Sequence, residues 1–379
     1  MVNVDCQSRR STRISVIILG CALCTVMMAY FVFGDNNDEQ GLRNLRMISI
    51  VFRHGEKTPT SFYPNDPYAL HDWPGGLGAL TQKGSQQAYN LGKNLRMRYY
   101  RLLPPNGVYT QQQVHVLSSA AERCIMSAQS VLAGFMPPLD HNNFLLLAMK
   151  KPCLKYDTIL QKLYKNPPPE LKKINEENAE LFKLLSKHSG KNISTLIDVE
   201  LLYTTLKIEA EGGLVLPDWT ENIYPDKLVA LAARSYSFYT ETNLMKKVKG
   251  GTFLAEIIKK MENKRRKNLN PDRKIFLYSA HDITLVNIMN TLNILDQTDT
   301  LPSYASALSF ELHHSSLFKD DFEVKIVYYY NSDDKFPKEI HIPNCSAPCS
   351  LTQFSTTFNG LLLDNYDDTC ENPKVDCKA

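Results

Sequence analysis

The sequence predicts an α/β fold, in which a sheet flanked by helices carries a second, mainly helical lobe. Short, apolar, β-branched runs alternate with segments of helical spacing near both ends of the chain. Between them, residues 155–245 contain the break Pro167-Pro168-Pro169 and then charged helical segments. The 379 residues, 43% of them hydrophobic and 22% charged, are typical of an ordered protein with one large or two moderate domains.

The elements of the first half follow in order from their residue patterns. Met47–Phe52 is a short apolar run rich in β-branched residues, and it predicts a buried strand. Residues 56–80 are rich in Pro and Gly and predict a loop. Thr81 can cap a helix whose apolar residues follow at helical spacing. Val114–Leu117 then predicts a second strand, and Ile125–Phe135 predicts a helix.

The second half returns to alternating elements after the helical insertion at 155–245. Phe253–Met261 predicts an amphipathic helix, and Ile275–Tyr278 predicts an apolar strand. Ala307–His313 and Phe322–Tyr330 both alternate and are rich in β-formers, so they predict a pair of strands.

The N-terminus carries a targeting segment. Residues 14–33 form an uncharged, mostly apolar run, with Arg9, Arg10 and Arg13 before it and acidic residues after it. This order predicts a cytosolic N-terminus at 1–13 and an exported remainder. The run is long enough for a signal anchor, but a cleaved signal peptide fits equally well. Residues 34–45 are polar and predict a stem.

The cysteines and sequons agree with export. Of the five cysteines that follow Cys124, four lie in residues 345–379, where little regular structure is predicted. Late cysteines of an exported chain are typical of disulfides, and their spacing is not that of a zinc finger. The five are Cys153, Cys345, Cys349, Cys370 and Cys377. Asn192 and Asn344 each begin a glycosylation sequon.

The charge balance argues against a nucleic-acid partner. The chain has 43 Lys and Arg against 40 Asp and Glu, a formal charge of +3. The basic run between Lys259 and Lys267 follows an amphipathic stretch, and it predicts a solvated helix end.

Chemically active side chains follow the predicted strands at their carboxyl ends, where open α/β sheets place their ligand sites. Two groups follow a strand directly, a third residue follows after a short loop, and a lysine lies in the first loop. They are, in that order, Arg53-His54-Gly55, His281-Asp282, Arg123 and Lys57.

This set matches what a phosphate monoester requires. The ester carries roughly −1.5 to −2 charges at neutral pH, and cations around its oxygens let a nucleophile approach. Arg53, Arg123 and Lys57 can supply those cations. A neutral imidazole, of His54 or of His281, can act as the nucleophile. Asp282 can give a proton to the leaving oxygen, and acid pH favours its protonated form. No metal or cofactor is required.

Two longer segments carry a resemblance to a known family. The run from Val51 to Pro59 resembles the signature of the histidine acid phosphatases, which include prostatic, lysosomal and insect venom enzymes, and Tyr278 to Asp282 resembles their second signature. Further motifs follow in family order, and the resemblance covers residues 46–370. They are Leu216-Pro217-Asp218-Trp219, Pro302-Ser303-Tyr304-Ala305-Ser306 and Cys345 to Cys349.

The resemblance implies a phosphoglycerate-mutase-like fold, a mixed and mostly parallel sheet with a smaller helical cap. It implies a metal-independent acid phosphatase in which His54 becomes phosphohistidine and Asp282 is the general acid. Arg53, Arg123 and His281 then bind the phosphoryl oxygens. Lys57 stands where the family has a second arginine, and lysine keeps the charge but loses the fork.

The resemblance also implies the disulfides Cys153–Cys370 and Cys345–Cys349, and Cys124 is expected to be a buried, unreactive thiol. The expected partner is a small phosphate monoester; a membrane contact requires an uncleaved N-terminus, and relatives are often homodimers. The expected location is extracytoplasmic, whether secreted, lysosomal or anchored. The alternatives are an inactive binding protein on the same scaffold, or an enzyme restricted to a lysophospholipid or an inositol phosphate.

Overall fold

The computed structural model describes residues 42–371, apart from 105–106, 108, 138–146, 149–152, 316, 319 and 364–365. The chain forms two compact units, Met1–Leu45 and Arg46–Ala379, and the description below concerns the second. The predicted segments 1–13 and 14–33, most of the stem, and Cys377 lie outside the described residues. No helix in the described part of the chain has the length and apolarity needed to cross a bilayer.

Seven strands of the described residues form one sheet, in the order β3-β2-β4-β1-β5-β6-β7. The strands are β1 (Leu45–Arg53), β2 (Val114–Ser118), β3 (Leu147–Ala148), β4 (Ile275–Ala280), β5 (Ala307–His314), β6 (Phe322–Tyr329) and β7 (Lys338–Ile340). β4 pairs in parallel with β1 and with β2, and β2 pairs in parallel with β3. β6 pairs antiparallel with β5 and with β7. The expectation of a mixed sheet is therefore confirmed, as is the predicted pairing of the two late strands.

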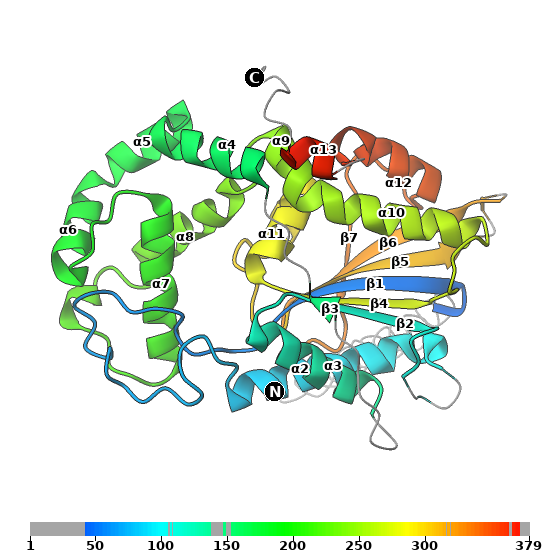
Figure 1. The fold of residues 1–379 in the computed structure, drawn as a ribbon, viewed down its shortest axis with the longest axis horizontal. Coiled ribbons are helices and arrows are strands. Elements are labelled where there is room, and N and C mark those ends of the chain that lie inside the picture. Colours follow the sequence, from blue (N-terminus) through cyan, green and yellow to red (C-terminus); the bar gives the residue numbers. More distant parts are fainter. Residues whose placement is uncertain are drawn as a thin grey trace, which may run out of the picture. The chain divides into compact units, whose positions relative to one another are not determined.

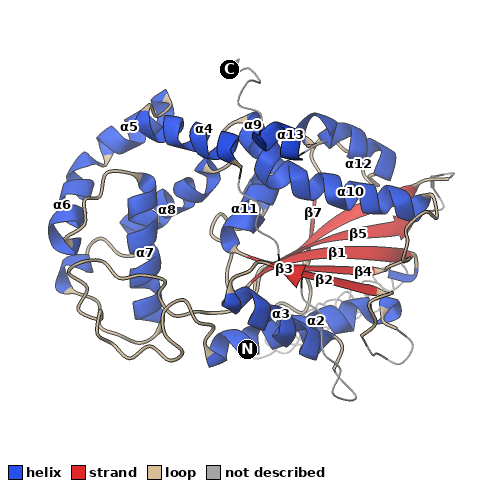
Figure 2. Cartoon of the chain, viewed as in Figure 1, coloured by secondary structure: helices blue, strands red, loops and turns tan. Residues whose placement is uncertain are grey.

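Helices cover both faces of this sheet (Figure 1). The helices that flank it are α2 (Gln82–Tyr99), α3 (Glu122–Phe135), α10 (Thr252–Arg265), α11 (Asp282–Thr291), α12 (Leu351–Phe358) and α13 (Tyr366–Glu371). α2 and α3 lie below the sheet in the view of Figure 2, and α10 and α12 lie above it.

The alternation along β5 explains the two layers. Leu308 and Phe310 pack into the apolar core that β5 shares with α10, α11 and α12. Ser309 and Glu311 point to the other face, where the hydroxyl of Tyr99 from α2 donates to Oε1 of Glu311 at 2.7 Å and lies 2.9 Å from Oγ of Ser309. Successive side chains of β5 therefore point to opposite faces of the sheet, and each face is covered by a different layer of helices.

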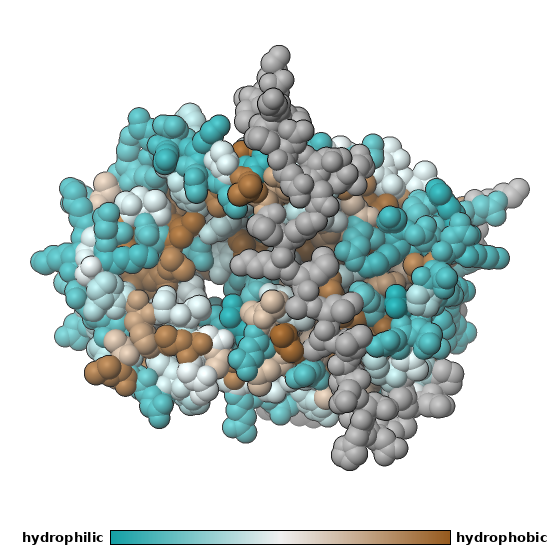
Figure 3. Space-filling view, viewed as in Figure 1, coloured by the Kyte–Doolittle hydropathy of each residue, from teal (hydrophilic) through white to brown (hydrophobic). Residues whose placement is uncertain are grey.

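The segment predicted to be helical forms a lobe with its own apolar core, beside the sheet in Figure 1. Its helices are α4 (Leu154–Lys165), α5 (Pro169–Glu177), α6 (Ala179–Ser189), α7 (Leu196–Glu211), α8 (Asp226–Phe238) and α9 (Asn243–Lys246). Leu185, Leu206 and Leu228 are among the fully buried residues of this core. Hydrophilic side chains cover the visible surface of α5 and α6 (Figure 3), as their charged sequences lead one to expect.

Two predictions about regular structure and charge were wrong in part. The last residues contain α12 and α13, although little regular structure was predicted there. Ser350 caps α12 by accepting from the backbone N–H of Gln353. In the basic run, Lys260 is mostly buried beneath its ion pair with Glu256 and donates to the hydroxyl of Tyr278 at 2.6 Å. The run is therefore solvated on one side of α10 and paired on the other.

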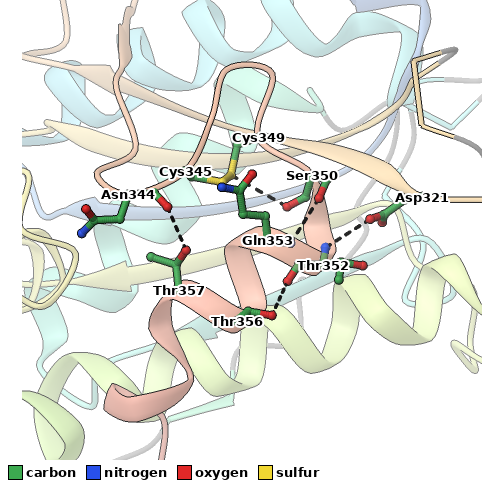
Figure 4. Close-up of a disulfide and its surroundings, with 9 residues drawn as sticks. All are labelled: Asp321, Asn344, Cys345, Cys349, Ser350, Thr352, Gln353, Thr356 and Thr357. Atoms are coloured by element: carbon green, nitrogen blue, oxygen red, sulfur yellow. Dashed lines mark hydrogen bonds between the residues drawn. A yellow bond between two sulfur atoms is a disulfide. The ribbon is translucent and has the colours of Figure 1, made fainter.

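Both expected disulfides are present. Cys153–Cys370 joins the start of α4 to α13 across 217 residues of sequence. Cys345–Cys349 closes the loop that precedes α12, and Figure 4 shows it beside the Ser350 cap. The backbone carbonyl of Asn344 accepts from the hydroxyl of Thr357, so this loop is also tied to α12. Cys124 is buried and unpaired, as predicted.

Candidate active site

The parallel pairing of β1 with β4 brings the two signature segments together. Arg53 is in register with Ala280, so His54 and His281 both emerge at the carboxyl ends of adjacent strands. The backbone N–H of His54 donates to the carbonyl of Ala280, 3.2 Å away. Arg123 lies in the first turn of α3, which follows the neighbouring strand β2 after a short loop. All three strand ends thus contribute to one site, as their order in the sheet requires.

Two glycines set the distance between the first signature and α2. A Cβ atom on Gly55 would overlap the backbone of Gly84, and a Cβ on Gly84 would overlap the backbone of Glu56. Neither glycine has a left-handed φ, so close approach rather than backbone conformation requires them. Because Gly84 lies in the first turn of α2, this contact fixes the signature against the start of the helix.

The tautomer of His54 follows from its contacts. Its Nδ1 lies 2.8 Å from the carbonyl oxygen of Gly55, which can only accept, so Nδ1 carries the proton. Nε2 then has a free lone pair, and it accepts from Nε of Arg123 at 3.2 Å. Burial and then Arg53 hold the pKa of His54 well below its ordinary value, although Asp282 opposes them. The imidazole is therefore neutral, with a nucleophilic nitrogen that faces a cation.

Arg53 is almost fully buried and anchored on three sides. Its guanidinium pairs with Asp282 at 2.8 Å, donates to the carbonyl of Pro302 at 2.6 Å and stacks over the ring of Tyr304. Its Nε is also buried and has no acceptor among the described residues. A buried donor of this kind lacks a partner that a bound phosphoryl oxygen would supply.

Asp282 begins α11, where the partial positive charge of a helix N-terminus favours a carboxylate. Burial by itself raises the pKa of Asp282, but the ion pair with Arg53 outweighs burial and lowers it to about 2. Acid pH favours the protonated form of Asp282, as expected, but with this lowered pKa the carboxyl of the free site is ionised near pH 5. A proton donor at this position must receive its proton when the substrate binds.

The other cationic groups complete the site. Lys57 is buried, and its ammonium donates to Thr60 Oγ1 at 2.9 Å; burial, then Arg123 and Arg53, lower its pKa to about 8. His281 Nε2 lies 2.9 Å from Ser119 Oγ. Burial, then Arg123, lower the pKa of His281 to about 4. The structure thus brings together all six predicted residues.

A small cavity of about 20 Å³, room for one water molecule, lies beside Arg53 and Asp282. The helical lobe lines it with Tyr203, Lys207 and Tyr236. Sequence reasoning missed these residues, because nothing in a helical pattern tells which side will face a distant strand end. Tyr304 was also missed, although it lies in a quoted family motif, and Ser119 carried no signal.

The fold and the site define an α/β protein in which a neutral histidine lies among cations at the carboxyl ends of parallel strands. The chain belongs to the histidine phosphatase superfamily, branch 2, whose family model matches residues 44–193 and 148–329. The resemblance found in the sequence is thereby confirmed. No group of three His, Cys, Asp or Glu in the described part of the chain is arranged to hold a metal ion.

Named relatives are acid phosphatases. The chain is 30% identical to lysosomal acid phosphatase of Rattus norvegicus, over 87% of this chain and 81% of the relative. It is 31% identical to a venom acid phosphatase of Apis mellifera, over 88% and 90%. It is 29% identical to human prostatic acid phosphatase, over 86% and 88%. These relatives support an acid phosphatase in an extracytoplasmic location.

Among solved structures, the chain is similar to the phytase of Hafnia alvei in complex with tartrate. The TM-score is 0.64 at 18% sequence identity, and the match covers 87% of this chain and 99% of the phytase. The likeness concerns the fold alone, and it confirms the predicted α/β class.

Proposed function

We propose that the protein is an acid phosphatase that hydrolyses phosphate monoesters through a phosphohistidine at Nε2 of His54. The observation that carries this proposal is the tautomer of His54, whose free lone pair faces Arg123. Arg53, Arg123, Lys57 and His281 bind the phosphoryl oxygens. No observation favours an inactive binding protein on this scaffold.

In the first step, Nε2 of His54 attacks phosphorus and the bond to the ester oxygen breaks. The proton on Nδ1 stays with His54, and the Gly55 carbonyl stabilises the positive charge that the phosphorylated ring acquires. Asp282 gives its proton to the leaving oxygen, which departs as an alcohol.

The substrate supplies the proton that Asp282 lacks in the free site. The second pKa of a phosphate monoester is about 6, so the monoanion predominates in acid. Its oxygens compete for Arg53 and bring negative charge next to Asp282, and both effects raise the pKa of that carboxyl. The monoanion therefore transfers its proton to Asp282 on binding, which makes the reaction depend on acid pH.

In the second step, water attacks phosphorus and the N–P bond breaks. The carboxylate of Asp282 accepts a proton from this water, so that inorganic phosphate leaves and neutral His54 is restored. The small cavity beside Asp282 has room for one water molecule.

We further propose that residues 14–33 direct export, either as a signal anchor or as a cleaved signal peptide. The proposed compartment is the cell exterior or the lysosome, and the proposed assembly is a homodimer. The side chains at Asn192 and Asn344 are exposed, which supports glycosylation at both sequons. The N-terminal residue of the natural protein distinguishes an uncleaved anchor from a cleaved signal peptide.

The catalytic assignment is tested by hydrolysis of p-nitrophenyl phosphate near pH 5 in the presence of a chelator. His54→Ala should lower kcat by about 10³-fold or more, because the nucleophile is lost. His341→Ala, which changes an exposed histidine elsewhere, is the matched control and should retain activity. Equal activity of His54→Ala and wild type would contradict the assignment.

The role of Asp282 is tested with Asp282→Asn on two esters. Nitrophenolate leaves without help from an acid, whereas the alkoxide of glycerol 2-phosphate does not. We expect the variant to release a burst of nitrophenol and then to turn over slowly, and to be slow from the start on the glycerol ester. Identical losses without a burst would argue that Asp282 only positions Arg53.

A further inference from the structure

The loop 56–80, here called the site loop, joins the phosphate site to the helical lobe. Lys57 lies at one end, and Thr58 Oγ1 donates to the carbonyl of Gly76 at 2.6 Å, so both ends of the loop are tied together. The Cβ position of Gly78 is 3.7 Å from the guanidinium of Arg123. The position of the site loop therefore affects two of the cations that face the substrate.

The middle of the site loop rests on the helical lobe, chiefly on α7. Thr205 Oγ1 donates to the carbonyl of Ser61 at 3.2 Å. Asn65 Nδ2 donates to the carbonyl of His188, in the last turn of α6, at 3.0 Å. The ring of Trp73 lies against Gly212 at the end of α7. These contacts use neutral groups, which do not change with pH.

One contact in this interface is of a different kind. Glu209 of α7 is fully buried, and neither of its carboxyl oxygens has a donor among the described residues. Asp66 of the site loop lies within hydrogen-bonding reach of it and is also buried. Asp66 Oδ1 accepts from the backbone N–H of Tyr68 at 2.7 Å, whereas Oδ2 has no partner in the described residues.

Two ionised carboxylates cannot face each other in a buried interface without a compensating charge. The titratable groups whose charges act together with Glu209 are Asp66 and Tyr63 of the site loop. A proton on Glu209 removes the conflict, because the acid then donates to Oδ2 of Asp66. Burial, and next the charge of Asp66, raise the pKa of Glu209 to about 8.

We propose that Glu209 and Asp66 share one proton, and that this proton holds the site loop on α7 in the position that phosphate binding requires. The pair acts as a positioning device for Lys57 and rests on the proposed function of the site. In acid the loop is docked. Above the pKa of Glu209, two carboxylates repel, the loop moves from α7, and phosphate affinity falls. A bound cation would need more oxygen ligands than these two carboxyls provide.

The first test follows docking without turnover. The chain has two tryptophans, so Trp219→Phe leaves Trp73 as a reporter within the site loop. The emission of Trp73 should change with a midpoint near the pKa of Glu209, about pH 8. Glu209→Gln donates to Asp66 at every pH and should abolish the transition; Asp66→Asn should do the same, by donating to Glu209. His71, whose ring contacts Trp73, is common to all variants.

An unchanged transition in both variants would overturn the proposal. So would a transition that 1 mM Ca²⁺ removes and a chelator restores, because the pair would then hold a cation rather than a proton. Glu177→Gln, an exposed change in the same lobe, is the matched control and should behave as the parent.

The second test measures KM and kcat for p-nitrophenyl phosphate between pH 5 and 9.5. Lys57 titrates in every variant, so the ratio of KM in wild type to KM in Glu209→Gln isolates the shared proton. This ratio should be near one in acid and should rise about tenfold per pH unit above the midpoint, with kcat less affected. A constant ratio would overturn the proposal. If the wild type hydrolyses no ester, the proposed function fails, while the Trp73 emission still decides the shared proton.

Discussion

At the scale of single residues, Lys57 stands where the resemblance to the histidine acid phosphatases implies a second arginine. Its ammonium is buried beside Arg123 and Arg53, and burial and these neighbours lower its pKa to about 8. Its charge is therefore present below about pH 8 and is lost as pH rises through that value. A guanidinium at this position would stay charged and offer two parallel donors.

Lys57→Arg should keep the enzyme active and tighten inhibition by inorganic phosphate. One added charge-assisted hydrogen bond contributes about 1 kcal/mol, or roughly fivefold in affinity. The gain should grow above pH 8, where only the arginine remains charged. The measurement is Ki for phosphate at pH 5 and pH 9, with Lys172→Arg on exposed α5 as control. A higher Ki for phosphate in the variant would show that the guanidinium of arginine does not fit the site.

The roles of single residues could be predicted from the sequence where they depended on position along the chain. Their protonation states could not, because these depend on which side chains the fold brings next to them. Arg53, His54, Arg123 and Asp282 lie at the ends of strands or shortly after them, and parallel pairing brings these strand ends together. The ionised state of Asp282 depends on its ion pair with Arg53, whose geometry no sequence pattern reveals. The same holds for Glu209, whose burial against Asp66 depends on how a loop docks on a helix.

At the scale of elements, the two disulfides differ in the length of chain that they close. Strands and helices near the site agreed with the predictions from their sequence patterns, but α13 was missed because six residues carry too little periodicity.

The disulfide Cys153–Cys370 joins α13 to α4 across 217 residues of sequence, whereas the disulfide Cys345–Cys349 spans only 4.

Removal of each disulfide should therefore have unequal effects. On the chain-entropy model, Cys153→Ser with Cys370→Ser should lower the free energy of unfolding by about 5 kcal/mol, and the short loop's double variant by about 2 kcal/mol. Denaturant titration of both variants checks this order. An equal loss of unfolding free energy in the two double variants, or a larger loss in the short loop's variant, would show that packing of the 345–349 loop against α12 matters more than chain entropy.

At the scale of the whole molecule, buried carboxyls of two kinds bound the pH range of stability. The pKa of Asp282 and the pKa of Glu311 are both about 2. Burial raises the pKa of Glu311, but His313 and Arg98 outweigh burial and lower it. Their contribution is present above about pH 4 and is lost as pH falls through 2. Burial raises the pKa of Glu209 to about 8, so the native state keeps a proton that the unfolded chain releases. Stability is therefore lost as pH rises from about 4.5 to 8.

The histidines act in the opposite sense in the middle of this range. The pKa of His281 is lowered to about 4, so the native state holds fewer protons than the unfolded chain up to about pH 6.5. This gain offsets the loss from Glu209 in that interval. We expect the free energy of unfolding to be nearly flat between about pH 4.5 and 6.5 and to fall on both sides.

Denaturant titrations from pH 3 to 9 test this profile. Each pKa unit corresponds to about 1.4 kcal/mol, so Glu209→Gln should gain on the wild type by an amount of the order of 4 kcal/mol between pH 4.5 and 8.5. Parallel profiles of the two proteins over this interval would show that Glu209 does not hold a proton in the folded state.

The contact between Gly55 and Gly84 has a consequence for how this signature can vary in evolution. Backbone meets backbone at that point, so any side chain at either position must push α2 away from the strand end. The neighbouring side chains of Glu56 and Lys57 point elsewhere, to Lys83 and to Thr60. The charged side chains of the loop can therefore vary without disturbing this contact, whereas a side chain at Gly55 or Gly84 would change the distance between the strand end and α2.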